Sequence, residues 1–460
     1  METKRILPLV VCVAGLMALA CAHAEAQSTS GWINIYRDTA TRLIKAATGD
    51  DFAWQRLAEL TDTYGNRLSG SENLARATAW AAETMKKDGL DNVRTEKVMV
   101  PKWTRGRESA EIIDPARHPL TILGLGGTVA TPPGGIEGDV LAVESFNELR
   151  MRSADARGKI VLFNEPFTNY ADTVSYRTGS ARAAAQAGAI AVLVRSVGPV
   201  GLRTPHTGSV QYQADVSPIP AAALSGEDAN RIARLLARGR RVRVHLSLEG
   251  KSEGEVESAN VVGEIRGREL PNEVVVIGGH FDSWDVGTGS TDDGGGCVAT
   301  WEALRLMKKL NLRPRRTVRV VLWTNEENGG RGGQAYRDAH LEELPNHVMM
   351  LESDGGVFRP TGFGFSGSDA GRGKVRDIAT LLGGIHADTI GASGGGADIG
   401  PSVQQANIPA MSLEVDGNYF LIHHTPADTI DKIDPLEIAR SAGAIAVLTY
   451  VVAEMPDRLR

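Results

Sequence analysis

Residues 278–296 read GGHFDSWDVGTGSTDDGGG, and this stretch decides the fold that the sequence predicts. An apolar run at residues 274–277 precedes it, as in a buried strand, and a helical pattern follows from about residue 294. In an open α/β sheet, ligands bind in the loops that follow the carboxyl ends of the strands. The loop carries one histidine and four aspartates: His280, Asp282, Asp285, Asp292 and Asp293. Such a crowd of carboxylates needs a cation, and histidine beside carboxylates is typical of zinc sites.

The same placement recurs along the later part of the chain. Apolar runs that predict strands cover residues 318–323, 347–351 and 410–415, and helical patterns lie between them. The polar residues that follow these runs are Glu326, Glu327, Asp354, His423 and His424. Each of them alone has an ordinary structural explanation in a turn or on a solvated surface. Their repeated position at successive strand ends predicts a single metal site in an α/β fold.

Length and composition limit the classes of protein to which the chain can belong. The chain has 460 residues, which is too long for one ordinary core and predicts two domains. Hydrophobic residues make up 42% and charged residues 23%, which are globular values. The formal net charge of -6 argues against a nucleic-acid-binding protein, which would carry a basic face.

The N-terminus has the pattern of an export signal. Lys4 and Arg5 precede an apolar stretch at residues 6–20 that is too short to span a bilayer, and Ala-His-Ala at residues 22–24 is a cleavage site. We therefore expect residues 1–24 to be a signal peptide and the protein to be periplasmic or secreted. A lipid anchor at Cys21 is disfavoured, because the residue three positions before a lipidated cysteine is usually larger than Ala18. We expect no stable membrane span elsewhere.

A shift in composition marks an inserted domain. We expect residues 25–117 to form an N-terminal arm and the first part of the catalytic domain, residues 118–250 an insert, and residues 251–460 the main part of the catalytic domain. The insert reads as short strands with one strong strand–helix unit, whose alanine-rich helix covers residues 181–187, and with a further helix capped by Ser225. It has no paired carboxylates. Its one polar candidate is the loop TPHTG at residues 204–208, which contains His206.

The residue types suggest how a metal site of this kind would work. Two metal ions about 3.5–4 Å apart, sharing one bridging carboxylate, would hold and acidify a water between them. A carboxylate that is not a ligand must then move the proton, and Glu326 is the candidate. Neighbouring residues at a strand end point to different sides, so Glu326 and Glu327 can have different roles. Asp282, two residues after His280, points to the same side and can orient the imidazole.

Several motifs resemble one family. They are GGHFDSWDVGTGSTDDGGG at 278–296, LWTNEENGG at 322–330, ESDGGVFRPTGF at 352–363, HHTPADT at 423–429, GNRLSGS at 65–71 and TPHTG at 204–208. In order and spacing they resemble the co-catalytic di-zinc peptidases, which include bacterial zinc aminopeptidases and glutamate carboxypeptidases. The likeness is strongest to the carboxypeptidase Q group of that family.

The resemblance implies a mixed sheet flanked by helices, a protease-associated insert, two zinc ions per subunit and a homodimer. It implies that His280 and Asp354 bind one zinc, that Glu327 and His424 complete the other, and that Asp292 bridges them. It also implies that Glu326 is the general base and that Asp282 orients a ligand. Asp428 stands at the family's offset after the ligand histidine, which favours His424 over His423. Further candidates for substrate contact are His206, Arg331, Tyr419, His423 and residues 393–396.

These features predict an exported di-zinc metallopeptidase that hydrolyses short peptides, chiefly dipeptides, with free termini. An aminopeptidase with the same zinc site is the main alternative, because the site does not reveal which terminal charge of the substrate is recognised. A receptor-like relative without catalysis and a glutaminyl cyclase with one zinc are weaker alternatives, since every ligand position is filled here. Cobalt or manganese also fits a carboxylate-rich site.

Overall fold

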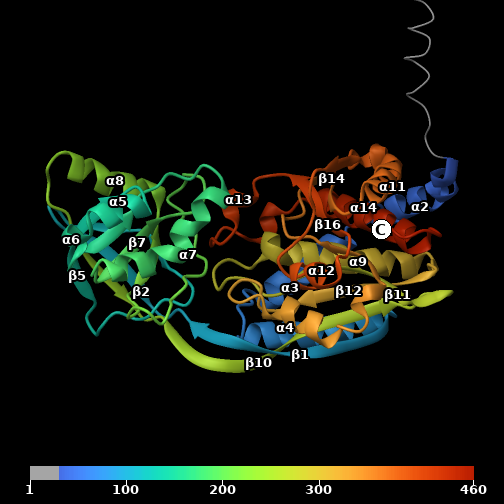
Figure 1. The fold of residues 1–460 in the computed structure, drawn as a ribbon, viewed down its shortest axis with the longest axis horizontal. Coiled ribbons are helices and arrows are strands. Elements are labelled where there is room, and N and C mark those ends of the chain that lie inside the picture. The colour runs from blue at the N-terminus through green and yellow to red at the C-terminus, as the bar shows by residue number, and fades with distance from the viewer. Residues whose placement is uncertain (1–30) are drawn as a thin grey trace, which may run out of the picture.

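The computed structural model describes residues 31–460, which form two lobes (Figure 1). The predicted signal peptide at residues 1–24 lies outside the described residues. The large lobe contains both the start and the end of the described chain, and the small lobe is inserted between them. Two long antiparallel strands, β1 (Asp91–Thr104) and β10 (Lys251–Ile265), run along one edge of the molecule and lead into and out of the small lobe.

The large lobe is built on a mixed sheet, as predicted. Among the described residues this sheet has eight strands in the order β1-β10-β12-β11-β13-β16-β14-β15. The remaining strands are β11 (Leu270–His280), β12 (Arg316–Trp323), β13 (His347–Glu352), β14 (Arg359–Ser366), β15 (Thr389–Gly391) and β16 (Ala410–Asp416). The predicted strands at residues 274–277, 318–323, 347–351 and 410–415 lie within β11, β12, β13 and β16.

Both faces of this sheet are buried, because successive side chains of a strand point to opposite faces. In β11, Val275 and Ile277 pack into one core, and Val274 and Val276 pack into the other. The helices of the large lobe cover these two faces. They are α2 (Arg37–Ala47), α3 (Phe52–Tyr64), α4 (Glu72–Lys87), α9 (Gly295–Lys309), α10 (Arg331–Ala339), α11 (Asp369–Ala379), α12 (Gly400–Ala406), α13 (Tyr419–Ile422) and α14 (Pro435–Glu454).

Helix α14 is rich in apolar residues along its whole length. Among the described residues it is the one helix long and apolar enough to cross a membrane, but most of it is buried in the protein. It packs in the same core as α2, α3 and α9. Its apolar character is therefore explained by its place in the centre of the large lobe.

Four neighbouring strands bring the polar loops to one edge of the sheet. β12, β11, β13 and β16 are parallel to one another. The carboxyl ends of parallel strands lie at the same edge, so the loops after His280, Trp323 and Glu352 meet there. This is the physical basis of the predicted cluster.

The small lobe has its own sheet, in the order β3-β2-β9-β5-β6-β7-β8-β4. Its strands are β2 (Glu108–Asp114), β3 (His118–Leu120), β4 (Ile122–Gly124), β5 (Ile136–Val143), β6 (Ile160–Phe163), β7 (Ala191–Arg195), β8 (Ala221–Leu224) and β9 (Arg243–Leu248). Its helices are α5 (Phe146–Met151), α6 (Ser153–Ala156), α7 (Tyr170–Gln186) and α8 (Gly226–Ala237). Two apolar cores lie on the two faces of this sheet.

Two boundaries in the small lobe differ from the sequence expectation. The strand β2 precedes residue 118 but pairs with β3 and β9 of the small lobe, so we propose to begin the inserted domain before β2. The alanine-rich segment predicted as a short helix is the end of the longer helix α7, which starts at Tyr170 with Asn169 as its cap. The predicted cap Ser225 does accept a hydrogen bond from the backbone N–H of Asp228 at the start of α8.

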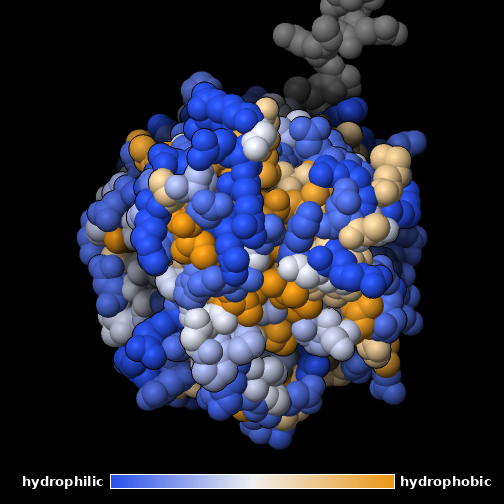
Figure 2. Space-filling view, turned by 90° about the vertical axis from the view of Figure 1, so that its left-hand side faces the viewer, coloured by the Kyte–Doolittle hydropathy of each residue, from blue (hydrophilic) through white to orange (hydrophobic). Residues whose placement is uncertain are grey.

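The outer face of the small lobe is shown in Figure 2. Most of this face is polar, and hydrophobic residues gather in a band across its middle. Three apolar side chains of the small lobe are strongly exposed: Met151, Val200 and Leu202.

Candidate metal centre

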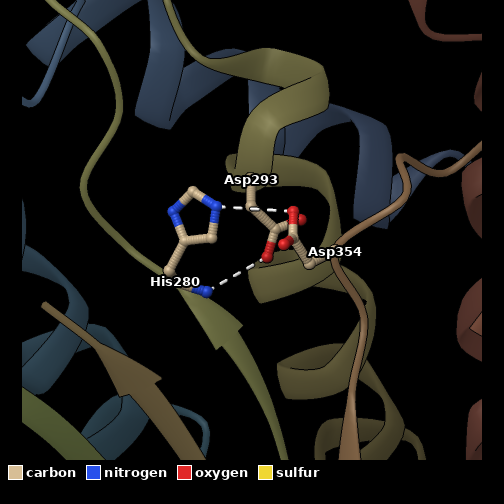
Figure 3. Close-up of side chains that lie close together, drawn as sticks. All are labelled: His280, Asp293 and Asp354. Atoms are coloured by element: carbon tan, nitrogen blue, oxygen red, sulfur yellow. Dashed lines mark hydrogen bonds and ion pairs between the residues drawn. The ribbon is translucent and has the colours of Figure 1, made fainter. Parts of the chain in front are cut away.

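The first half of the site forms around His280, the last residue of β11. Its Nε2 atom lies 3.1 Å from Oδ1 of Asp292 and 3.4 Å from Oδ1 of Asp354. Its Nδ1 atom donates to the backbone carbonyl of Asp282 at 3.0 Å, which fixes the tautomer and leaves Nε2 free to face the two carboxylates. Figure 3 shows the imidazole and Asp354 pointing toward each other.

The second half forms around His424, which follows α13. Its Nε2 atom lies 3.2 Å from Oδ2 of Asp292 and 3.1 Å from Oε2 of Glu327. Asp292 therefore lies between two imidazoles and turns one oxygen toward each. The structure brings together all five residues predicted as ligands.

The two neighbouring aspartates have different contacts. Asp293 turns both carboxylate oxygens toward backbone N–H groups, accepting from His280 at 3.1 Å and from Gly296 at 3.2 Å. Figure 3 shows the first of these contacts at the end of β11. Asp293, His280 and Asp354 are close enough to share an ion, but the oxygens of Asp293 already hold the backbone between β11 and α9. Asp292 is thus better placed as a bridging ligand.

The carboxylate of Asp282 is hydrogen-bonded to the backbone of Glu326. The carboxylate of Asp282 accepts from the hydroxyl of Ser69 at 2.9 Å and from the backbone N–H of Glu326 at 3.1 Å. Its distance to Nδ1 of His280 is 4.0 Å, so the imidazole is oriented by the backbone carbonyl of Asp282 and not by its carboxylate. The carboxylate instead fixes the segment that carries Glu326.

Burial and crowding perturb the titration of these groups. Burial raises the pKa of Glu326 well above its usual value, and the negative charges of Asp354 and Glu327 raise it further. Burial opposes protonation of His280, but Asp354 and Asp292 outweigh it and raise the pKa of His280 well above the usual range. The neighbouring carboxylates thus favour protonation of both residues, whereas burial favours it for Glu326 and opposes it for His280.

The donor set fits metal ions. The oxygen Oε1 of Glu327 is buried without a hydrogen-bond partner among the described residues. His280, Asp292 and Glu327 each offer an atom within 4.8 Å of the others. Carboxylate oxygens and imidazole nitrogens are suitable ligands for zinc, and an unpaired buried carboxylate oxygen is otherwise costly.

Two residues that sequence reasoning did not assign to the site hold its loops. Asp428 accepts from the backbone N–H groups of Thr291 at 2.7 Å and Asp292 at 3.1 Å. The buried guanidinium of Arg67 donates to the backbone carbonyls of Phe281, Gly65, Thr288 and Gly289. Both residues stand in quoted motifs, HHTPADT and GNRLSGS, which was the signal available for them.

The small lobe contacts His424 on its Nδ1 side, opposite the Nε2 atom that faces the carboxylates. Nδ1 of His424 donates to the backbone carbonyl of Thr207 at 3.1 Å, and the backbone N–H of Thr207 donates to the carbonyl of His424 at 2.9 Å. These reciprocal bonds hold a residue whose φ is +60°, a strained value for a side chain other than glycine. Arg177 of α7 lies beside the same contact, with Nη1 3.2 Å from Nδ1 of His424.

The residues predicted to contact substrate have different positions. Tyr419 donates to Oδ1 of Asp354 at 3.4 Å and stacks on His423. His206 is buried, with Nδ1 3.0 Å from the carbonyl of His423, so both histidines belong to the contact between the lobes. Arg331 is paired with Glu255 at 2.6 Å, away from the ligand cluster. In the predicted loop at 393–396, the N–H of Gly394 donates to Ser366, and the loop packs on β14 and Glu352.

A pocket of about 420 Å³ opens beside the site, between the two lobes. Glu326 and Glu327 line it from the large lobe, and Gly126, Ser209 and Gln211 line it from the small lobe. The hydroxyl of Ser209 also donates to the backbone carbonyl of Glu327 at 2.8 Å. The small lobe thus forms one wall of the space in front of the metal centre.

Comparison with known proteins identifies the family. Residues 260–449 match peptidase family M28, and residues 127–232 match the PA domain. The chain is 43% identical to carboxypeptidase Q of Mus musculus, over 92% of this chain and 91% of the relative. It is 44% identical to carboxypeptidase Q of Homo sapiens, over 88% and 86%.

Solved structures agree with this assignment. A crystal structure of a peptidase M28 precursor from Shewanella amazonensis is similar with a TM-score of 0.90 and 34% identity, covering 93% of this chain and 99% of that one. A zinc aminopeptidase from Bacillus subtilis shares the fold, with a TM-score of 0.67 at 19% identity, over 88% and 96% of the two chains. The family implies peptide substrates and zinc as the metal. The chain therefore belongs to peptidase family M28, as a carboxypeptidase Q-like metallo-exopeptidase that carries a PA domain.

Proposed function

We propose that this protein is an exported peptidase that binds two zinc ions and hydrolyses short peptides, chiefly dipeptides, with free termini. One observation carries the proposal. Asp292 lies between two imidazoles, with Oδ1 3.1 Å from Nε2 of His280 and Oδ2 3.2 Å from Nε2 of His424. A carboxylate in this position can bridge two metal ions.

The ligands divide into two sets around this bridge. His280 and Asp354 would hold one zinc ion, Glu327 and His424 would hold the other, and Asp292 would bind both. When bound, zinc polarises the scissile carbonyl and lowers the pKa of water. The unpaired Oε1 atom of Glu327 supports its assignment as a ligand.

Glu326 is the proposed general base. It lines the pocket, and its backbone is fixed by the carboxylate of Asp282. Its carboxylate would take a proton from the attacking water and deliver it to the nitrogen of the leaving amine, so that the C–N bond breaks without a free amide anion. Tyr419, which donates to Asp354, is positioned to contact the substrate beside the same ligands.

An aminopeptidase activity is the second candidate. It is favoured by the similarity to a protein of Aspergillus fumigatus named "Probable leucine aminopeptidase 2". That protein is 26% identical to this chain over 65% of this chain's length. The 43% identity to carboxypeptidase Q over 92% of the chain favours recognition of the free carboxyl terminus. A receptor-like role is disfavoured, because every ligand position and Glu326 are filled.

Export and dimer formation are parts of the same proposal. Export rests on the charged start, the apolar stretch and the cleavage site within residues 1–24. A homodimer would cover apolar surface, and the exposed side chains of Met151, Val200 and Leu202 offer such a surface on the small lobe. The mass of the mature protein in solution, measured by light scattering, tests the dimer.

The decisive experiment is hydrolysis of one dipeptide in three forms by the zinc-loaded protein: free, N-acetylated and C-amidated. Cleavage of only the free form is the expected result, because both termini are then recognised. Cleavage of the acetylated but not the amidated form would mean a broader carboxypeptidase. The reverse pattern would establish an aminopeptidase and overturn the proposal. No cleavage of any form would favour the receptor-like alternative.

A further inference from the structure

The pocket beside the metal centre must accommodate the charged end of the substrate. It has walls from both lobes and contains Glu326 and Glu327. In a dipeptide, the terminal carboxylate lies one residue beyond the scissile bond, a span of at most about 3.6 Å. The group that recognises this carboxylate must therefore line the same pocket as Glu326.

The lining of the pocket offers one cation. Its described lining residues are Pro101, Lys102, Trp103, Gly126, Gly127, Ser209, Val210, Gln211, Ser252, Glu326, Glu327, Asn328 and Gly329. Lys102 alone among them is positively charged. A charge-assisted hydrogen bond to a cation in the pocket would hold a substrate carboxylate and orient it.

The other cations near the site either are engaged by buried partners or do not line the pocket. Arg67 is saturated by four backbone carbonyls. Arg105 holds Asp285 through two hydrogen bonds, at 2.8 and 2.6 Å. Arg177 lies on the Nδ1 side of His424, behind the ligand. Arg331 is paired with Glu255 and does not line the pocket.

The stem of Lys102 is closely packed, and its ammonium group is in a partly exposed ion pair. The turn at Gly70 packs so closely that a Cβ atom there would lie 3.1 Å from Cβ of Lys102. The ammonium group is 2.9 Å from Glu253 of β10, and both side chains are about one-third exposed, at 35% and 29%. A pair this exposed contributes little free energy, so Lys102 can exchange Glu253 for a substrate carboxylate at small cost.

We propose that Lys102 binds the α-carboxylate of the residue that follows the scissile bond, and thereby sets the preference for a free carboxyl terminus. This inference rests on the proposed peptidase function. The residue that distinguishes a carboxypeptidase from an aminopeptidase then lies on β1, a strand outside the metal-binding loops.

The test compares a free dipeptide with its C-amidated form, using full-length zinc-loaded protein. Lys102→Met is expected to lower kcat/KM for the free dipeptide roughly 10- to 100-fold, chiefly through KM, because a hydrogen bond to a charged group is lost. The amidated form should be unaffected, and Lys102→Arg should retain most of the preference. Lys97→Met is the matched control, since Lys97 pairs with Glu257 across the same two strands but does not line the pocket.

A second variant keeps the test independent of folding defects in Lys102→Met. Glu253→Gln removes the competing partner, so it should lower KM for the free dipeptide and leave the amidated form unchanged. An unchanged kcat/KM for the free dipeptide in Lys102→Met, with normal cleavage by the wild type, overturns the inference and leaves the proposed function intact. A wild-type protein that cleaves both forms equally, or neither, overturns both.

Discussion

Adjacent residues at the end of β12 have different partners, and this separation is the basis of the proposed chemistry. Glu327 faces His424 at 3.1 Å, while Glu326 lines the pocket and its backbone is fixed by Asp282. A carboxylate whose charge is neutralised by a bound metal ion is a weaker base, so the two roles are better served by separate side chains. The alternation of side chains at a strand end gives the chain both functions within two residues.

Substitution of each glutamate should therefore give a different result. Glu326→Gln is expected to fold, to retain the zinc content of the wild type, and to lose about 10²- to 10⁴-fold in kcat, because the proton carrier is removed. Glu327→Gln is expected to lose metal as well as activity, because a charged ligand is removed. Metal analysis and kinetics of both variants provide the check. Near-normal turnover by Glu326→Gln would remove it from the role of base.

A second residue, His347 at the start of β13, should make stability depend on pH. Burial, aided by the charge of Arg319, lowers the pKa of His347 to about 4. Its Nδ1 atom donates to the carbonyl of Glu343 at 3.2 Å, and its Nε2 atom accepts from the hydroxyl of Tyr336 at 2.9 Å, so the neutral form is the one bound. In the unfolded chain the pKa is about 6.5.

Because the unfolded state binds the proton more readily, folding stability should fall as pH decreases from about 6.5 to about 4. His347→Gln should be less stable than the wild type at pH 7.5 and should lose less stability between pH 7.5 and pH 5. Urea unfolding at the two pH values measures this difference. An equal loss in His347→Gln would contradict the assignment.

At the scale of the element, the loop at residues 204–208 connects the small lobe to the metal centre. Thr207 in this loop accepts a hydrogen bond from the imidazole Nδ1 of His424 and donates its backbone N–H to the carbonyl of His424. The Nδ1 atom of His206 lies at hydrogen-bond distance from the carbonyl of His423. Gly208 has φ of +138°, and a Cβ atom there would lie 2.4 Å from the guanidinium carbon of Arg177. This glycine therefore permits α7 to pack against the loop.

Gly208→Ala should displace Arg177 and loosen the contact with His424. We expect faster release of zinc to a chelator and a lower kcat, with the overall fold retained. Gly239→Ala is the matched control, because Gly239 also has positive φ, at +71°, but has open space around its Cβ position. Equal zinc release by both variants and the wild type would show that the loop does not position the ligand.

At the scale of the whole molecule, the metal centre concentrates negative charge at one edge of the large sheet. Asp292, Asp293, Glu327 and Asp282 are all buried there, and Asp354 is partly exposed beside them. Binding of metal ions by the folded state alone stabilises it by mass action. A zinc-loaded centre is therefore expected to stabilise the large lobe.

Removal of zinc should accordingly lower the melting temperature, on the order of 10 °C for two tightly bound ions. Added zinc should restore the melting temperature, and calorimetry with and without chelator measures the change. Asp292→Ala should bind neither ion, and its melting temperature should respond to neither chelator nor zinc. A variant that retains two ions would show that the bridge lies elsewhere.

The order and chemistry of the site residues could be predicted from the sequence, because they follow local rules. Buried strands are continuous apolar runs, and polar residues directly after such runs fall at one edge of a parallel sheet. His280, Glu327 and Asp354 are found by this argument, and the structure places them together. The choice of His424 over His423 needed the family resemblance, since both stand in the same loop.

Other features depended on the tertiary structure. The orientation of His424 by Thr207 depends on residues 217 positions apart in the chain, and the shared wall of the pocket joins Ser209 to Glu327, which are 118 positions apart. The attachment of β2 to the small lobe depends on pairing with β9, far along the sequence. Lys102 lies in none of the quoted motifs, and its proposed role follows only from its position in the lining of the pocket. The sequence by itself determined which chemical groups the chain possesses and at which strand ends they fall. The tertiary structure decided how the two lobes meet around those groups, because such contacts arise from packing between distant segments and have no local pattern.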